Sequence, residues 1–350
     1  MDVIGWVALG KDGRLRAGWR VLGHIFLLMV SIVVLGLGGS VVVGLLLTLF
    51  GDGPQLSRPF SMAVSHVLSW AVCMPPLVVS VLLLNARYKG GFRLGRLRGV
   101  GQGGPALRSL GEIGLGLVLG PFGVAIAVAI MALGGMSVQL STPSVASVAT
   151  SAMVAIILVF AAWFEELLFR GYLFQWLGGA IARVFQAACR AMGLGRVGGQ
   201  IASFMGFYIP ILLSSVLFGM LHLSNPGATD LSTVNTVLAG VWFSVLVLRQ
   251  GSLWSAISAH WAWNATILLG VGLPVSGLGP ETGLHVVSLI DLEASGPEWL
   301  SGGLYGPEGS IGATVALVVL TAVSAILPRR KKKHGLVAVY EVQGVTGAGT

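Results

Sequence analysis

The stretch Trp163-Phe164-Glu165-Glu166-Leu167-Leu168-Phe169-Arg170-Gly171 places three ionisable side chains inside an otherwise apolar run, residues 145–176. Such a run is typical of a membrane-spanning helix, where each charged side chain costs roughly 2.5–3.5 kcal/mol at the bilayer centre. Residues four apart share a helical face, so Arg170 is expected to neutralise Glu166, whereas Glu165 points about 100° away. The pattern predicts an ion pair with one spare carboxylate, although a purely structural ion cluster would use the same three residues.

The composition predicts an all-α, polytopic membrane protein. Of 350 residues, 55% are hydrophobic and 10% are charged, whereas a soluble domain carries about a quarter charged residues. Two cysteines provide neither a disulfide framework nor a thiolate metal site. The net charge of +8 comes from basic residues scattered in short loops, so it reflects membrane topology and does not indicate nucleic-acid binding.

Hydropathy predicts about eight transmembrane helices, with the active site in the helix bundle. The predicted spans are residues 21–50, 60–84, 113–133, 145–176, 208–223, 234–248, 253–271 and 311–327. Residues 178–207 are predicted to form an interfacial helix and a loop. They contain a Gly-x-Gly-x-x-Gly match, which is dismissed because no strand precedes it.

The spans form one predicted membrane domain, residues 21–328, between a cytoplasmic N-terminal tail (1–20) and a basic cytoplasmic C-terminal tail (329–350). With both termini inside, nineteen of the 21 Lys and Arg residues lie in the cytoplasm; the exceptions are Arg58 and the intramembrane Arg170. Seven acids lie outside, five of them in the loop 274–310. This segregation supports eight spans, and the expected location is a bacterial inner membrane.

Two histidines lie in predicted spans, His222 at the end of Phe218-Gly-Met-Leu-His222 and His260 at the start of His260-Trp-Ala-Trp-Asn264. No histidine is followed by Glu, so the His-Glu-x-x-His zinc helix is absent. Glu165 with His222 could hold and deprotonate a water, and His260 with Asn264 could donate hydrogen bonds to a tetrahedral oxyanion. The predicted spans, however, place Glu165 in the cytoplasmic half of one helix and His222 near the outer end of another.

Glu165-Glu166-x-x-x-Arg170, Phe218-x-x-x-His222 and His260-x-x-x-Asn264 occur in this order on three spans. Together they resemble the three motifs of the type II CAAX prenyl endopeptidase family, which includes the bacterial CPBP, or Abi, intramembrane proteases. The resemblance covers about residues 161–269, the motif core.

The resemblance implies a role for each motif residue. Glu165 and His222 match the pair that positions the water, His260 and Asn264 match the oxyanion side, and Glu166 and Arg170 match a supporting pair. This mechanism requires no cofactor. A zinc-dependent version of the protease would use Glu165, His222 and His260 as ligands.

The leading hypothesis is a glutamate-dependent intramembrane endopeptidase that cleaves a peptide or protein near the membrane surface. Its expected partners are the lipid bilayer and a substrate that is either prenylated or a pro-peptide. Nucleic acid is not an expected partner. The alternative is a catalytically idle membrane scaffold or bacteriocin-immunity factor of the same fold. The intact motifs favour the enzyme, because a scaffold has no need for an unpaired Glu165.

Overall fold

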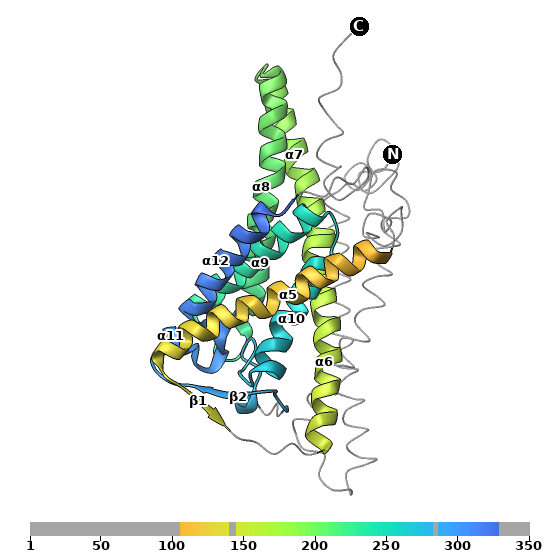
Figure 1. The fold of residues 1–350 in the computed structure, drawn as a ribbon. Helices are drawn as coiled ribbons and strands as arrows, with labels where there is room; N and C mark the ends of the chain where they lie inside the picture. The colour runs from red at the N-terminus through yellow and green to blue at the C-terminus, as the bar shows by residue number, and fades with distance from the viewer. Residues whose placement is uncertain (1–105, 140–144, 283–285, 329–350) are drawn as a thin grey trace, which may run out of the picture. The chain divides into compact units, whose positions relative to one another are not determined.

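The computed structural model describes residues 106–139, 145–282 and 286–328 (Figure 1). The chain divides into two units, Met1–Arg93 and Leu94–Thr350, and all described residues belong to the second. The predicted spans at residues 21–50 and 60–84 and both predicted tails lie outside the described residues. Their prediction is therefore untested.

The described part is mostly helical, as predicted. Its α-helices are α5 (Ala106–Met131), α6 (Val145–Glu166), α7 (Phe174–Ala191), α8 (Gly195–Leu221), α9 (Asp230–Gln250), α10 (Trp254–Ala265), α11 (Glu298–Ser301) and α12 (Ile311–Ile326). Two segments are π-helical, η2 (Leu167–Leu173) and η4 (Thr266–Gly270). The 3₁₀ turns are η1 (Ala132–Gly134), η3 (His222–Ser224), η5 (Pro280–Thr282), η6 (Gly303–Tyr305) and η7 (Pro307–Gly309). Strands β1 (Met136–Gln139) and β2 (Asp291–Ala294) pair antiparallel.

Four helical segments of the described part are long and apolar enough to cross a membrane: Ser109–Gly134, Ser151–Gly171, Gly195–Ser224 and Asp230–Gln250. They correspond to the third to sixth predicted spans. The eighth predicted span is the shorter apolar helix α12, and the seventh is divided between α10 and η4. Because α12 and α10 are shorter than a typical membrane span, the count of eight spans remains a prediction.

The segment between the fourth and fifth spans, predicted as an interfacial helix and a loop, forms a helical hairpin. Helix α6 continues through η2 into α7, and α8 begins at Gly195 rather than at residue 208. Gly193 and Gly195 adopt positive φ angles of 67° and 47° in the turn that joins the two arms, a conformation that only glycine adopts without strain. The interfacial-loop prediction was wrong for residues 195–207 because hydropathy marks the apolar part of a helix, not its first residue.

This hairpin removes the mismatch in level between Glu165 and His222. Helices α7 and α8 lie side by side (Figure 1), and a Cβ on Gly206 would lie 2.7 Å from the Cβ of Ala182. Further along, the rings of Phe169 and Phe218 are 5.1 Å apart. Glu165 and His222 each lie four residues beyond this ring contact, on opposite arms of the hairpin, so they are at the same level.

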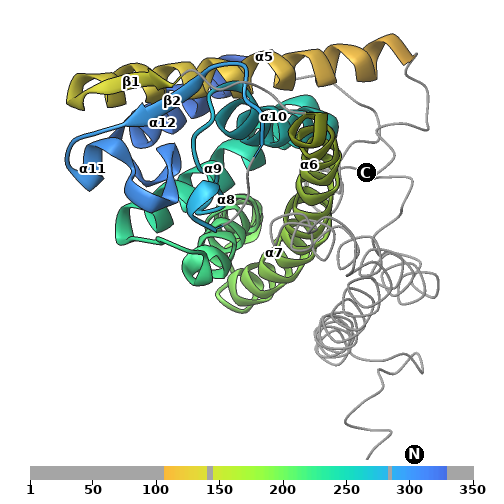
Figure 2. The same ribbon diagram turned by 90° about the horizontal axis from the view of Figure 1, so that it is seen from below.

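Helix α10, which carries two of the predicted site residues, packs closely against α5 (Figure 2). A Cβ on Gly120 would lie 2.7 Å from the backbone nitrogen of Trp263 and 2.8 Å from the carbonyl oxygen of Ala259. Small residues allow helices to approach this closely in a membrane protein. On the other sides, α9 and α12 contribute Trp242, Phe243 and Leu320 to the same buried core.

Three loops that the predicted topology places on one side of the membrane contact one another. Strand β1 follows α5 and pairs with β2 of the loop 274–310. In the same loop, the backbone nitrogen of Gly277 donates to the carbonyl oxygen of Tyr305 at 3.0 Å, and Tyr305 packs against Gly227 of the turn between α8 and α9. These contacts agree with the predicted segregation of the loops.

Candidate active site

The predicted ion pair between Glu166 and Arg170 is present and completely buried. Arg170 Nη1 lies 2.8 Å from Glu166 Oε1, and both side chains are 0% exposed. The guanidinium carbon also lies 4.5 Å from the ring centre of Phe218 and 5.3 Å from that of Phe243. Stacking on aromatic faces stabilises a desolvated guanidinium, so Arg170 joins α6 and η2 to α8 and α9.

His260 joins this ion pair, which the motif spacing did not predict. Its Nδ1 lies 3.0 Å from Glu166 Oε1, and its ring stacks on Phe243 with centroids 4.8 Å apart. Because a carboxylate accepts, Nδ1 carries the proton and donates to Glu166. Nε2 therefore points to the other side of the ring, toward Glu165.

Glu165 does not take part in the Glu166–Arg170 ion pair, as the sequence predicted. Its Oε2 lies 3.8 Å from His260 Nε2, and the side chain is 20% exposed. That separation is too long for a direct hydrogen bond. Within the described residues, Glu165 Oε2 has no hydrogen-bond partner although it is buried.

His222 follows directly after the last residue of α8, and its orientation is set by its own helix. Its Nδ1 lies 2.7 Å from the carbonyl oxygen of Phe218. The carbonyl can only accept, so Nδ1 donates and Nε2 of the neutral ring is an acceptor. No direct hydrogen bond between Glu165 and His222 is found in the described part of the chain, although the hairpin brings them to the same level.

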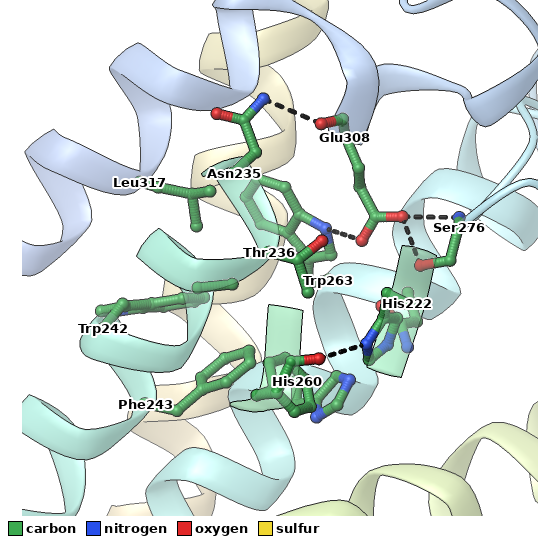
Figure 3. Close-up of a pocket in the computed structure, with 13 residues that line it drawn as sticks. His222, Asn235, Thr236, Trp242, Phe243, His260, Trp263, Ser276, Glu308 and Leu317 are labelled. Carbon is green, nitrogen blue, oxygen red and sulfur yellow. Dashed lines mark hydrogen bonds between the residues drawn. The ribbon is translucent and has the colours of Figure 1, made fainter. Parts of the chain in front are cut away.

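His222, His260 and Asn264 line one cavity (Figure 3). Water-molecule centres can occupy about 30 Å³ of it, which is room for roughly two waters, since one needs about 10–15 Å³. Phe218, Phe243 and Trp263 form apolar walls. The cavity is therefore small, mostly apolar and able to hold water beside the two predicted catalytic histidines.

A family comparison covers these residues. Residues 147–266 match the Rce1-like family of type II CAAX prenyl endopeptidases. The match confirms the resemblance expected from the motifs, and all six predicted site residues lie within it. No curated protein and no solved structure gives a significant match to the chain. Residues 147–266 are therefore similar to this protease family, and four long apolar helices of the described part indicate a membrane protein.

The cavity also contains residues beyond the Rce1-like segment that the motif analysis missed. Glu308 and Ser276 line it, and both belong to the loop 274–310, which the sequence analysis treated only as a group of outside acids. Glu308 Oε1 accepts from Trp263 Nε1 at 3.1 Å. No short-range pattern could reveal this bond, because 45 residues separate its partners.

Glu165, His222 and His260 were the expected ligands of a zinc-dependent version of the protease. A catalytic zinc site needs three protein ligands around one point. In the described ranges, no group of three His, Cys, Asp or Glu side chains is arranged in this way. The hydrogen bond from His222 Nδ1 to Phe218 leaves Nε2 free, so the zinc-dependent version remains an alternative prediction.

Proposed function

We propose that the chain is a glutamate-dependent intramembrane endopeptidase of the CAAX protease type. The observation that carries the proposal is the unpartnered Oε2 of Glu165. The neighbouring Glu166 is neutralised by Arg170, whereas the carboxylate of Glu165 faces His260, which lines the water-sized cavity. A partner-binding scaffold would gain nothing from this buried unpaired group, which costs about 1–3 kcal/mol or more.

In the proposed reaction, Glu165 and His222 hold the attacking water. His222 Nε2 accepts one hydrogen of the water, because Nδ1 already donates to Phe218. Glu165 takes the other hydrogen as a proton while the water oxygen bonds to the peptide carbonyl carbon. Glu165 then gives this proton to the amide nitrogen, the C–N bond breaks, and a carboxyl group and an amine are released.

His260 and Asn264 serve the oxyanion in this proposal. The Asn264 amide can donate directly. His260 donates from Nε2 only as the imidazolium, because Nδ1 already donates to Glu166. Glu165 and Glu166 flank the ring and compensate that charge. Each such donor is typically worth about 2.7–4 kcal/mol of transition-state stabilisation.

The proposed substrate is a peptide or protein whose cleavage site lies near the membrane surface, either a prenylated C-terminus or a pro-peptide. Most of the exposed surface inside the small cavity is apolar, although polar side chains also line it, and an apolar wall suits a substrate that approaches from the bilayer. Nucleic acid is not among the proposed partners, and the proposed location is a bacterial inner membrane.

The testing variant is Glu165→Gln, which keeps the size of the side chain and removes its charge. The matched control is Glu281→Gln, an exposed acid of the turn η5. Purified protein is incubated with the host membrane proteome, and new C-termini and substrate capture are measured in the same preparation. We expect Glu165→Gln to lose roughly 10²–10⁴-fold in cleavage rate with capture unchanged. If Glu165→Gln cleaves at the wild-type rate, the protease hypothesis is wrong and the scaffold hypothesis takes its place.

A chelator arm separates the two versions of the protease. Water held by Glu165 and His222 needs no metal, so cleavage should persist after exhaustive chelation. Loss of cleavage that zinc restores would establish the zinc-dependent alternative.

A further inference from the structure

Glu308 lies outside the segment that matches the Rce1-like family, yet it lines the same cavity as His222, His260 and Asn264. Both of its carboxylate oxygens are fixed. Oε2 accepts from the backbone nitrogen and the hydroxyl of Ser276, at 2.5 and 2.7 Å, and Oε1 accepts from Trp263 Nε1. Hydrogen bonds to an ionised carboxylate are about twice as strong as neutral ones.

Ser276, which hydrogen-bonds Glu308, has a strained backbone conformation. Its φ of +49° is the one positive φ of a non-glycine residue within the described ranges. Such a residue costs about 1–3 kcal/mol and persists only where its surroundings over-determine it. Here the two donors of Ser276 meet one carboxylate oxygen, so the strain is maintained by Glu308.

Trp263 connects this carboxylate to the helix of the oxyanion residues. It precedes Asn264 and lies three residues after His260 on α10. The α-helix ends at Ala265 and continues as the π-helical η4, a form that is rare and occurs mostly as single turns within α-helices. The bond from Trp263 to Glu308 therefore anchors the last α-helical turn where the helix changes form.

The residues just before Glu308 anchor the helix of the other histidine. Tyr305 is buried, and its backbone nitrogen would lie 3.0 Å from a Cβ on Gly227, in the turn that follows His222. Burial, together with the nearby charge of Glu308, raises the pKa of the Tyr305 phenol to about 12. The segment before Glu308 therefore packs closely against the turn that follows His222.

We propose that Glu308 is a positioning residue for the candidate active site. Its carboxylate, bonded to Trp263 and Ser276, fixes the α10 turn carrying His260 and Asn264 against the end of α8 carrying His222. Figure 3 shows Glu308 joined to Trp263 and Ser276, with His222 beside Ser276 and His260 further from the carboxylate. The proposal rests on the proposed protease function, because the residues that Glu308 positions are the proposed catalytic residues.

The kinetic test uses Glu308→Gln, Trp263→Phe and the double variant, with Glu281→Gln as the control. The glutamine amide group presents donors where Ser276 or Trp263 also donates, so one side of the anchor is lost. We expect kcat to fall by roughly tenfold to a hundredfold, since a misplacement of about 1 Å can cost 10²-fold, with little change in KM. The double variant should be little worse than either single one. A rise in KM at constant kcat, or additive losses, would overturn the proposal.

A second readout does not depend on cleavage. In protein with ¹⁵N-labelled tryptophan, the Nε1–H resonance of Trp263 is assigned by its disappearance in Trp263→Phe. We expect it to shift in Glu308→Gln and to stay in place in Glu281→Gln and Glu165→Gln. An unmoved resonance in Glu308→Gln would show that the anchor is not formed, whether or not the protein cleaves peptides. If Glu308→Gln does not fold, Trp263→Phe alone decides, and wild-type kcat in that variant would overturn the proposal.

Discussion

At the scale of single residues, two adjacent glutamates have opposite environments. Glu166 shares Oε1 between Arg170 and His260, and its Oε2 has no hydrogen-bond partner among the described residues. Glu165, by contrast, has no close ion pair: its Oε2 is buried without a hydrogen-bond partner and lies 3.8 Å from His260 Nε2. The first carboxylate is committed to holding the cluster together. The second is available for a proton, which is the division of roles that a general base requires.

Arg170→Ala should destabilise the folded protein as well as stop its activity. Breaking a buried pair on one side leaves an uncompensated charge, which costs about 3–5 kcal/mol; here Glu166 would keep only His260. Thermal unfolding in detergent measures the effect, with Arg183→Ala, an exposed arginine of α7, as the control. A melting temperature equal to that of the control would show that Arg170 does not stabilise the cluster.

The spacing of side chains on one helix made part of this cluster predictable. Four residues separate Glu166 from Arg170, and the expected ion pair is present. His260 lies 94 residues from Glu166, so its bond to that carboxylate depends on helix packing that no local pattern encodes. The sequence placed Glu308 among the acids of the loop 274–310, but it did not show that this side chain lines the cavity.

At the scale of helices, the position of α10 depends on the glycine face of α5. Gly120 lies against backbone atoms of Ala259 and Trp263, which lie on either side of His260 in sequence. Backbone atoms cannot move aside as a flexible side chain can. The distance between these two helices therefore controls where His260 and Asn264 stand.

Gly120→Ala should lower both stability and activity, because its methyl group would overlap the α10 backbone. Overpacking of this kind typically costs about 1–3 kcal/mol. The matched control is Gly114→Ala on the same helix, where an added Cβ meets nothing within 4 Å and helix propensity favours alanine by roughly 0.5–1 kcal/mol. The melting temperature and the cleavage rate should fall in Gly120→Ala and should be unchanged or higher in Gly114→Ala. Equal changes in the two variants would contradict the close packing of α5 and α10.

Helices α5, α6 and α9 were predictable because their apolar runs extend over most of their length. The hairpin of α7 and α8 was not, since its tip contains three arginines and several glycines and carries no hydropathy signal. The glycines that resembled a dinucleotide motif make the turn between the two helices.

At the scale of the whole molecule, the contacts among three loops constrain the topology. The β1–β2 pairing and the packing of Gly227 against Tyr305 require these loops to share one side of the membrane. An even number of spans must then separate them from one another. The predicted eight-span arrangement with both termini in the cytoplasm satisfies this requirement.

Reporter fusions test that arrangement directly. Fusions after Gly104, Pro297 and Lys333 should report inside, outside and inside, because each pair of neighbouring sites is separated by an odd number of predicted spans. A cytoplasmic signal at Pro297 would contradict the predicted topology.

The π-helical segment η2 begins directly after Glu166 and contains Arg170, and η4 begins two residues after Asn264. Hydrogen bonds in a π-helix span five residues instead of four, so each segment accommodates an additional residue. Removing one residue from either segment would leave a continuous helix but rotate one side of it against the other. A single-residue gap here in an alignment of related chains would therefore mark a change in active-site geometry, whereas the same gap in a connecting loop would change only its length.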